Sequence, residues 1–264
     1  MYSIAIGEAF RKFGPLAWPL RQYLIRLEKN ILRDAKSVVA ISSNFEPIYR
    51  RWKQDIKKFS MYPNWTPKNL FPHQEPSTEH STQKIVVYAG TLGMKHRPEL
   101  LLQLADDAEF KKLGGVVVVV SQGQGRKLLQ KSENIRENIV LKNFLTLPEL
   151  GKLFADASVL LAVLGPEASK FSVPSKIMSY LSAGKPIVAS IDPNNACAKI
   201  LEKTGAGIVI SPDDQAAEFV NAVNKIMSND KLAISMSEAG IKYSTEYFNS
   251  TIAAEFFTRQ IINI

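Results

Sequence analysis

Residues 116–120 read VVVVV and run directly into SQGQG at residues 121–125. Five consecutive β-branched residues favour a strand, and a strand that is apolar on both faces suits a parallel sheet covered by helices on both sides. The glycines that follow favour a tight turn, because glycine adopts positive φ without steric cost. We therefore predict a buried parallel strand whose carboxyl end opens into a loop.

The same order of apolar strand and amphipathic helix repeats on both sides of this stretch. Further strands are predicted at residues 84–90, 139–141, 158–164, 186–190 and 207–210. Helices are predicted at residues 98–110, 126–132, 147–155, 175–182, 196–204, 213–228, 231–243 and 250–262. In the first of these, Leu100, Leu101, Leu104 and Ala108 are expected to face inward. Each connection between parallel strands must pack a helix back on the sheet, so the predicted fold class is α/β with a doubly wound, Rossmann-like parallel sheet.

The first part of the chain has a different organisation. A helix is predicted at residues 15–33, a strand at 37–42, a helix capped by Ser43 or Asn44 and ending at Trp52, and a strand at 59–62. PHQEPSTEHSTQ at residues 72–83 is polar and has no periodicity, which is typical of a linker. We therefore predict a part at 1–71, a linker at 72–83, the Rossmann-like domain at 84–245 and a final helical segment at 246–264.

Composition limits the functional classes. Of the 264 residues, 45% are hydrophobic and 22% are charged, which is ordinary for a globular protein. The single cysteine, Cys197, excludes an internal disulfide framework, and the three histidines have no metal-ligand spacing. No apolar run approaches the ~20 residues that span a bilayer. These features predict a cytoplasmic protein with no metal and no cofactor.

The formal charge of +8 is concentrated near the N-terminus. Residues 1–58 contain 12 Lys and Arg against 5 Asp and Glu, whereas the remaining residues contain 21 against 20. Nucleic-acid-reading motifs are absent, so nucleic acid is not expected as a partner. An anionic membrane surface, contacted through residues 11–58, would make the protein peripheral to a membrane. Ordinary solvated helix faces explain the same charge equally well.

Ligands of open parallel sheets bind at the carboxyl ends of the strands, so a ligand-binding site is expected among the loops that follow the strands. Gly90, Thr91, Gly93 and Lys95 follow the first strand of the domain and suit an anion, although a tight turn would need the same glycines. The loop after the valine strand has Gly123 but lacks the third glycine of a dinucleotide fingerprint. The next strand ends in Lys142 and Asn143 rather than an acid, so an NAD site is not expected.

A third loop precedes the helix at 175–182. Pro174 pre-sets the helical φ, and Ser175 and Lys176 lie at the helix start, where exposed N–H groups favour an anion. A diphosphate is a natural ligand for such a helix end, and Lys176 would add a full charge. A capped helix with a solvent-facing lysine is the structural alternative.

Five ordered blocks carry a resemblance to a known family. They read GTLGMKHRPELLLQLA (90–105), VVVVVSQGQGRKLL (116–129), NIVLKNF (138–144), FSVPSKIMSYLSAGKPIVAS (171–190) and TGAGIVISPDD (204–214). Their order and spacing resemble the C-terminal domain of family-4-type retaining glycosyltransferases of the GT-B fold, in the bacterial branch that builds capsule, O-antigen and exopolysaccharide. RDAKSVVAISSNFEPIYRRW (33–52) and KFSMYPNWTPKNLF (58–71) resemble the end of the N-terminal acceptor domain, most of which has no counterpart here. The last helices resemble the tail that crosses back to that domain.

The resemblance implies a binding site for a nucleoside-diphosphate sugar. Gly90, Thr91, Gly93 and Lys95 would line the pyrophosphate, Asn143 and Phe144 would lie beside the base, and the turn Ser175-Lys176-Ile177 would offer N–H groups to phosphate. The full set of implied donor-binding residues is Gly90, Thr91, Gly93, Lys95, Gly123, Asn143, Phe144, Pro174, Ser175, Lys176, Ile177 and Ser179.

The sequence departs from the family at its acidic pair. Many members have E-x7-E, with one Glu facing the donor sugar and the second bonding the ribose; Phe171 and Ser179 occupy these positions here. No catalytic residue is therefore assigned. The implied function is a hexosyl transfer from a nucleoside-diphosphate sugar, a UDP-sugar, to a saccharide or lipid-linked saccharide acceptor in surface polysaccharide synthesis. A non-catalytic nucleotide-sugar-binding module is the alternative, and a GT-B-fold sugar-nucleotide epimerase fits the motif order less well.

Two residue groups outside these motifs carry weaker expectations. His96 follows the first loop and is interpreted as a surface residue. Phe256 and Phe257 in the last helix are expected to be exposed at the junction between domains, where they would favour a dimer.

Overall fold

The computed structural model describes residues 18–51, 59–67, 70–71, 83–133, 136–214 and 216–262. The chain divides into two compact units, one formed by residues 1–63 with 251–264 and the other by residues 64–250. Except for Gln83, the predicted linker at 72–83 lies outside the described residues. Across the described ranges, no helix combines the length and the apolar character needed to cross a membrane.

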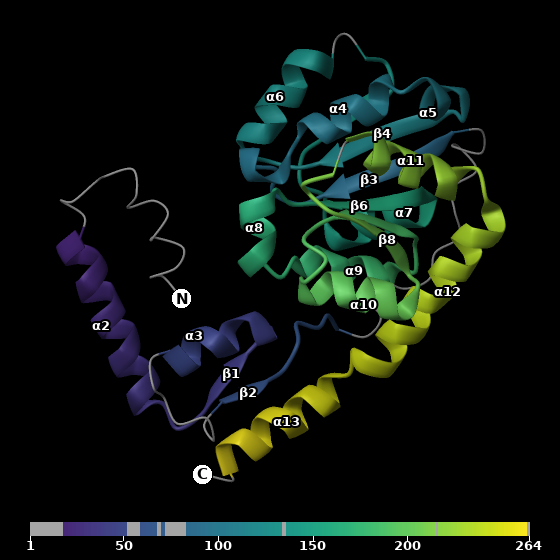
Figure 1. Ribbon diagram of the computed structural model, residues 1–264. Helices are drawn as coiled ribbons and strands as arrows, with labels where there is room; N and C mark the ends of the chain where they lie inside the picture. The colour runs from purple at the N-terminus through teal and green to yellow at the C-terminus, as the bar shows by residue number, and fades with distance from the viewer. Residues whose placement is uncertain are drawn as a thin grey trace. The chain divides into compact units, whose positions relative to one another are not determined.

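The larger unit is built on a six-stranded parallel sheet (Figure 1). Its strands are β3 (Lys84–Ala89), β4 (Gly115–Val120), β5 (Ile139–Lys142), β6 (Ala157–Val163), β7 (Ile187–Ser190) and β8 (Gly207–Ile210). They lie in the order β5-β4-β3-β6-β7-β8, and all neighbouring pairs are parallel. The predicted doubly wound α/β fold is confirmed. The strand order reverses between β3 and β6, which is where such sheets form a crevice for ligands.

Helices cover both faces of this sheet. One face packs on α7 (Leu147–Asp156), α9 (Ser175–Ala183) and α10 (Ala196–Thr204). The other packs on α4 (Glu99–Asp106), α5 (Ala108–Lys112), α6 (Gln124–Glu133) and α11 (Ala216–Met227). Alternate valines of β4 point to opposite cores: Val118 and Val120 to the first, Val117 and Val119 to the second. A strand with two buried faces explains why its sequence is uninterrupted valine.

The helix predicted at 98–110 is two helices, α4 and α5, separated at Asp107. The Asp107 carboxylate accepts from the Phe110 amide at 2.8 Å and caps α5. The same oxygen accepts from the side-chain amide of Asn224 on α11 at 2.8 Å. The chain turns at this cap, so the prediction that Ala108 faces inward is wrong: Ala108 is exposed and Ala105 is buried instead.

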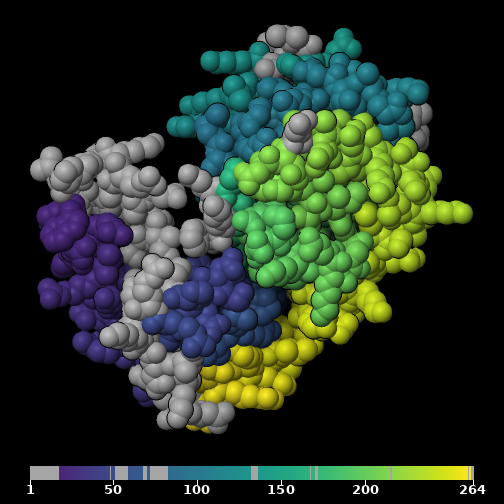
Figure 2. Space-filling view, in the orientation of Figure 1, coloured from purple at the N-terminus to yellow at the C-terminus, as the bar shows by residue number. Residues whose placement is uncertain are grey.

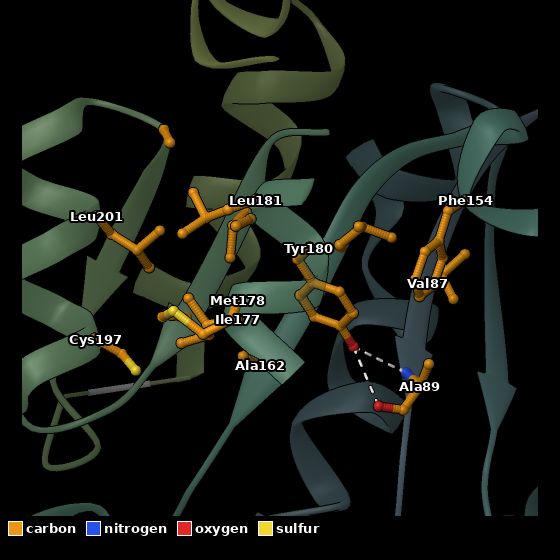
Figure 3. Close-up of a cluster of buried hydrophobic side chains, with 14 of the residues drawn as sticks. Val87, Ala89, Phe154, Ala162, Ile177, Met178, Tyr180, Leu181, Cys197 and Leu201 are labelled. Atoms are coloured by element: carbon orange, nitrogen blue, oxygen red, sulfur yellow. Dashed lines mark hydrogen bonds between the residues drawn. The ribbon is translucent and has the colours of Figure 1, made fainter. Parts of the chain in front are cut away.

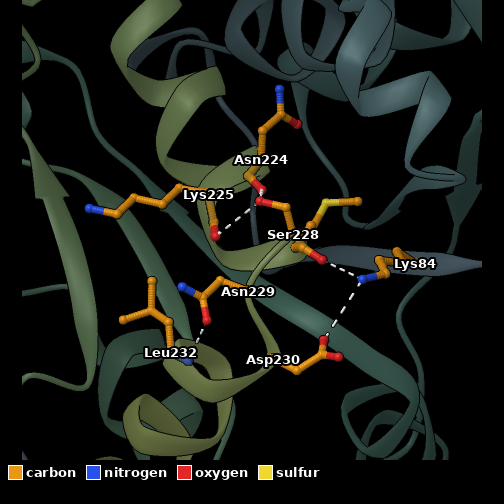
Figure 4. Close-up of polar contacts among 8 residues, drawn as sticks. Lys84, Asn224, Lys225, Ser228, Asn229, Asp230 and Leu232 are labelled. Atoms are coloured by element: carbon orange, nitrogen blue, oxygen red, sulfur yellow. Dashed lines mark hydrogen bonds and ion pairs between the residues drawn. The ribbon is translucent and has the colours of Figure 1, made fainter.

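The amino end of β3 is tied to the turn between α11 and α12 (Asp230–Tyr247) (Figure 4). The ammonium of Lys84 donates to the Met227 carbonyl and lies 4.0 Å from the Asp230 carboxylate. Asn229 caps α12 by accepting from the Leu232 amide at 3.0 Å. α12 then packs on α9, where Gly240 lies against Leu181. These contacts hold α9 in place from its outer side.

The smaller unit contains α2 (Trp18–Asp34), β1 (Val38–Ala40), a short 3-10 turn (Ser43–Phe45), α3 (Glu46–Arg51), β2 (Phe59–Met61) and most of α13 (Ser250–Ile262). β1 and β2 form a two-stranded parallel sheet. Gln260 accepts from the hydroxyls of Ser37 and Ser60, both at 3.1 Å, and so joins α13 to these strands. The helix cap is Ser42 rather than the predicted Ser43 or Asn44, because the Ser42 hydroxyl accepts from the Asn44 amide.

α2 exposes both its apolar and its basic side chains. None of its residues is buried, and Trp18, Tyr23 and Ile31 are 63%, 59% and 67% exposed. Its surface is drawn in purple in Figure 2, where much of it faces the viewer. On α13, Phe256 and Phe257 contact Tyr62 with tilted rings whose centroids lie 4.7 and 5.4 Å away, and Phe257 is 41% exposed.

Candidate donor-binding site

A pocket of about 430 Å³ opens at the carboxyl ends of β3 and β6. From β3 the chain continues to α4 on one face of the sheet; from β6 it continues through α8 (Pro166–Phe171) to α9 on the other face. The two connections diverge, so the space between them stays open. The pocket is lined by Ala89, Gly90, Thr91, Lys95, His96, Leu164, Ser172, Val173, Pro174, Ser175, Lys176 and Ser179.

The loop after β3 is held by backbone hydrogen bonds to the loop after β4. The amide of Gly90 donates to the Val120 carbonyl, and that of Leu92 to the Gln122 carbonyl, both at 2.9 Å. The Gly125 amide donates back to the Leu92 carbonyl at 2.8 Å. Gly123 has φ +111°, and a Cβ there would lie 2.8 Å from the Leu92 carbonyl oxygen. The second glycine loop therefore supports the first.

The side chain of Lys176 passes over Gly90 at the carboxyl-terminal end of the sheet. Gly90 has φ +129°, and a Cβ there would lie 3.4 Å from Cε and Nζ of Lys176. Lys176 is the second residue of α9 on one face of the sheet, yet its Nζ lies 3.8 Å from the ring centroid of Tyr88, which packs in the core on the opposite face. The absent side chain at Gly90 leaves room for this crossing.

The ammonium of Lys176 is buried and has no hydrogen-bond partner among the residues that the structure describes. Its described favourable contact is with the Tyr88 ring, whose hydroxyl is already used in donating to the Thr91 carbonyl at 2.9 Å. Burial lowers the pKa of Lys176 to about 7, because a charged amine is poorly solvated there. The alternative of a solvent-facing lysine is therefore wrong. A buried cation without a partner can readily accept an anionic one.

Tyr180 positions the first turns of α9 against the sheet (Figure 3). Its hydroxyl accepts from the Ala89 amide at 3.1 Å and lies 3.1 Å from the Leu161 carbonyl, to which it can donate. It thus joins the ends of β3 and β6 to the helix that carries Lys176. Burial raises the pKa of Tyr180 above its ordinary value, so the hydroxyl keeps its proton.

His96 lies in the short 3-10 helix at Met94–His96, beside Lys95. Its Nδ1 accepts from the Gly93 amide at 2.8 Å, and the ring is partly buried in the wall of the pocket. Burial, followed by the charges of Lys176 and Lys95, lowers the pKa of His96 to about 4. The interpretation of His96 as a simple surface residue is therefore wrong.

Unpartnered polar atoms gather at the same edge of the sheet. Within the described ranges, four buried side-chain nitrogen or oxygen atoms have no hydrogen-bond partner: Arg126 Nε, Lys176 Nζ, Ser190 Oγ and Asn224 Oδ1. The first three follow or end β4, β6 and β7 at their carboxyl ends. Buried polar atoms are normally paired, so three unpaired atoms at the carboxyl-terminal edge of one sheet indicate that a polar ligand binds there.

The pocket brings together seven of the twelve predicted residues: Gly90, Thr91, Lys95, Pro174, Ser175, Lys176 and Ser179. Gly93 caps the short helix next to them and Gly123 supports the loop from behind. Ile177 is buried in the core. Asn143 and the half-exposed Phe144 follow β5 outside the pocket, where Asn143 accepts from the Arg126 guanidinium at 3.3 Å. The donor-binding role of all twelve stays a prediction.

Sequence reasoning did not assign five of the residues that line the pocket, namely Ala89, His96, Leu164, Ser172 and Val173. It also missed Tyr88 and Tyr180, which contact Lys176 and Ala89 of the pocket wall. The tyrosines read as ordinary core residues, and His96 was interpreted as a surface residue although it directly follows Lys95. Ser172 is held by its carbonyl, which accepts from the Asn195 amide group at 2.7 Å. None of the residues that line the described pocket is Asp or Glu. Nor do three His, Cys, Asp or Glu side chains come together as a metal site anywhere in the described part of the chain.

Comparison with known proteins gives the family. The profile of the family described as "Glycosyl transferases group 1" matches residues 83–229, more than half of the chain. The chain therefore belongs to this family. The match covers all six strands of the larger sheet and the whole of the pocket.

Individual relatives agree with this assignment. The putative colanic acid biosynthesis glycosyl transferase WcaI of Escherichia coli (strain K12) is 23% identical over 216 residues, or 76% of this chain and 50% of the relative. This chain therefore spans half the length of that curated relative. WaaG, a glycosyltransferase involved in lipopolysaccharide biosynthesis, aligns with a TM-score of 0.70 at 15% identity over 93% of this chain and 68% of its own. Anabaena Alr3699/HepE in complex with UDP and glucose gives 0.73 at 14% identity, over 92% and 67%. The fold is thus that of GT-B glycosyltransferases.

Proposed function

We propose that the pocket at the ends of β3 and β6 binds the diphosphate of a nucleoside-diphosphate sugar and that the chain is the donor-binding part of a glycosyltransferase. The observation that carries this proposal is the buried, unpartnered Nζ of Lys176 at the switch point of the sheet. Lys95 adds a second cation, and α9 starts at Ser175 in the wall of the pocket. A diphosphate satisfies all three features at once.

The chemistry of sugar transfer places negative charge on the leaving diphosphate. A site that stabilises this charge accelerates the reaction, because the charge develops in the transition state. Lys95, Lys176 and the N–H groups at the start of α9 are the groups in this chain that would do so. We propose that no metal ion is needed, and that the reaction retains the configuration of the sugar, as the resemblance to family-4-type enzymes implies.

For the substrates, we propose a UDP-hexose donor and a saccharide or polyprenyl-linked saccharide acceptor in surface polysaccharide synthesis. Two findings support this. The relative WcaI is described as acting in colanic acid biosynthesis, and the neighbour HepE was solved with UDP and glucose. A lipid-linked acceptor would bring the enzyme to the inner face of the plasma membrane. The basic, uncovered surface of α2 suits such a position.

A second candidate is a nucleotide-sugar-binding module without catalysis. It is favoured by the composition of the pocket, where Ser179 occupies the position of a family acid and no described lining residue is acidic. A serine hydroxyl cannot offer ribose the charged, bidentate acceptor that a carboxylate offers. The two candidates share the donor site and differ only in turnover.

Calorimetric titration with UDP and GDP tests the shared proposal. We expect UDP to bind, and Lys95→Met to weaken binding because a pocket cation is lost. Lys203→Met is the matched control, since Lys203 lies exposed in the last turn of α10 away from the pocket. If neither nucleotide binds, the donor-site proposal is wrong. Release of UDP from UDP-glucose by this chain would then favour the enzyme over the non-catalytic module, and its absence the reverse.

A further inference from the structure

His96 is fixed in one protonation pattern by its own loop. Its Nδ1 lies 2.8 Å from the backbone nitrogen of Gly93. A backbone N–H can only donate, so Nδ1 must accept and carries no proton. In a neutral imidazole the proton then lies on Nε2. The loop therefore selects the tautomer whose free nitrogen is a hydrogen-bond donor.

The surroundings also keep the ring uncharged. A proton on Nδ1 would point at the Gly93 N–H, and Lys95 and Lys176 lower the pKa of His96 further below its ordinary value than burial alone. His96 thus contributes a donor without contributing charge. A third cation here would repel the two lysines, whereas a neutral N–H does not.

Nε2 has no acceptor in the described protein. The hydrogen bond to Gly93 is the one described for His96, and the pocket wall around it offers no carboxylate. The Lys176 ammonium, which lines the same pocket, also lacks an acceptor among the described residues. At the start of α9 the Ile177 amide donates to the Pro174 carbonyl at 3.0 Å, whereas no acceptor is described for the Ser175 and Lys176 amides. His96, Lys176 and Ser175 therefore bring donors without a described acceptor to one pocket, and ionised phosphate oxygens are acceptors.

We propose that His96 is a diphosphate-binding residue whose Nε2–H donates to a phosphate oxygen of the bound nucleoside diphosphate. This inference rests on the proposed donor site and adds a specific contact to it. Lys95 and Lys176 supply attraction that varies slowly with direction, whereas the imidazole N–H is directional and its orientation is preset by Gly93. His96 would therefore orient the diphosphate that the lysines attract.

The alternative is that His96 only caps the short helix at Met94–His96. Two substitutions separate the roles. His96→Gln keeps both functions, because glutamine caps helices from this position with its carbonyl oxygen and retains an N–H₂ donor. His96→Met has a similar size but keeps neither. In calorimetry with UDP we expect His96→Gln to bind within about threefold of wild type and His96→Met to bind between about 10-fold and 100-fold more weakly, which is the range for one hydrogen bond to a charged group.

Nitrogen-15 NMR of the ring gives a readout that a capping role alone would not move. We expect an unprotonated Nδ1 and a protonated Nε2 in the free protein between about pH 6 and pH 8, and a shift of the Nε2–H signal when UDP is added. UDP binding that leaves this signal unchanged overturns the inference. If His96→Met and His96→Gln weaken UDP binding equally, the inference is also wrong. The shape of the imidazole ring in the loop, rather than its N–H donor, would then explain the loss. If the wild-type chain binds no nucleoside diphosphate, both the proposed function and this inference are wrong. If the wild-type chain binds UDP and the His96→Met variant binds it equally well, the inference alone is wrong.

Discussion

Replacing Lys176 by methionine should make the protein more stable, and most so at low pH. In the folded protein the pKa of Lys176 is about 7, against 10.5 for a free lysine. At 1.36 kcal/mol per pKa unit, this difference corresponds to about 5 kcal/mol of cost for the buried charge below pH 7. Methionine has a similar length and packs well against an aromatic ring such as Tyr88. We expect Lys176→Met to gain at least about 2 kcal/mol in unfolding free energy at pH 6.5.

The dependence on pH has a definite sign. Between pH 7 and 10.5 the unfolded chain binds more protons at Lys176 than the folded chain, so wild-type stability rises with pH in this window. The advantage of Lys176→Met should therefore shrink from pH 6.5 to pH 9.5. Urea unfolding at both values measures it, with Lys203→Met as the exposed control. A difference that stays constant across this range, or a methionine variant less stable at pH 6.5, would refute the reasoning.

The same group should link UDP binding to proton uptake. A bound diphosphate favours the charged form of Lys176 and so raises its pKa from about 7. At pH 8 UDP binding should then take up close to one proton, and UDP affinity should fall as pH rises from 7 to 9. Calorimetry in two buffers of different ionisation enthalpy counts the protons. Lys176→Arg, which stays charged, should bind UDP without proton uptake, and uptake that persists in this variant would contradict the assignment.

Three further perturbations test the support of the site and the surface of α2. Gly90→Ala should lose UDP affinity, because its φ of +129° strains any side chain and the new Cβ lies 3.4 Å from Lys176. Gly205→Ala, with φ +72° and open space around it, should cost only stability. Calorimetry measures the UDP affinity of both variants, and thermal melting measures their stability. Tyr180→Phe should lose about 1–3 kcal/mol in urea unfolding, since the Ala89 amide is left buried and unpaired, whereas Tyr23→Phe on the exposed α2 should lose none. Reversing the charge of three residues of α2, Arg21, Arg26 and Lys29, should abolish sedimentation of the protein with phosphatidylserine vesicles at low salt. Unchanged binding by this variant, or equal binding of the wild-type protein to neutral vesicles, would exclude an electrostatic membrane contact.

Most strands of the larger sheet could be predicted because their causes are local. Val116–Val120 specifies a buried strand through β-branched side chains alone, and glycines mark its end. The break between α4 and α5 could not be predicted in the same way. Asp107 falls inside a continuous apolar periodicity, and its carboxylate both caps α5 locally through the Phe110 amide and accepts from Asn224, which is 117 positions away. The cap itself is a local signal that the periodicity masked, whereas the bond to Asn224 leaves no local pattern.

The residues of the candidate site also differ in whether their roles have local or distant causes. Glycine, proline and serine at the strand ends are turn and helix-start signals, so Gly90, Pro174 and Ser175 could be singled out from sequence. The burial of Lys176 could not, because it requires the open space at Gly90 and the ring of Tyr88, which folding brings together from some 86 to 88 positions away. His96 was missed for a related reason, since its tautomer is set by the Gly93 backbone, which any sequence would supply.

The family resemblance predicts an acid at the position of Ser179, and this prediction bears on the buried Lys176. A carboxylate at the position of Ser179, in the wall shared with Lys176, would neutralise the lysine and compete with a diphosphate for it. Without that acid, protonated Lys176 has no carboxylate partner among the described residues, which costs stability, and a bound diphosphate would supply the missing negative charge. Recognition in this chain should therefore depend on the phosphates more than on the ribose. Under the proposed function, such a site would bind the leaving diphosphate strongly, and that is the part of the donor where charge develops during transfer. With serine rather than an acid at position 179, we therefore predict that the chain selects poorly for the ribose and still binds the diphosphate.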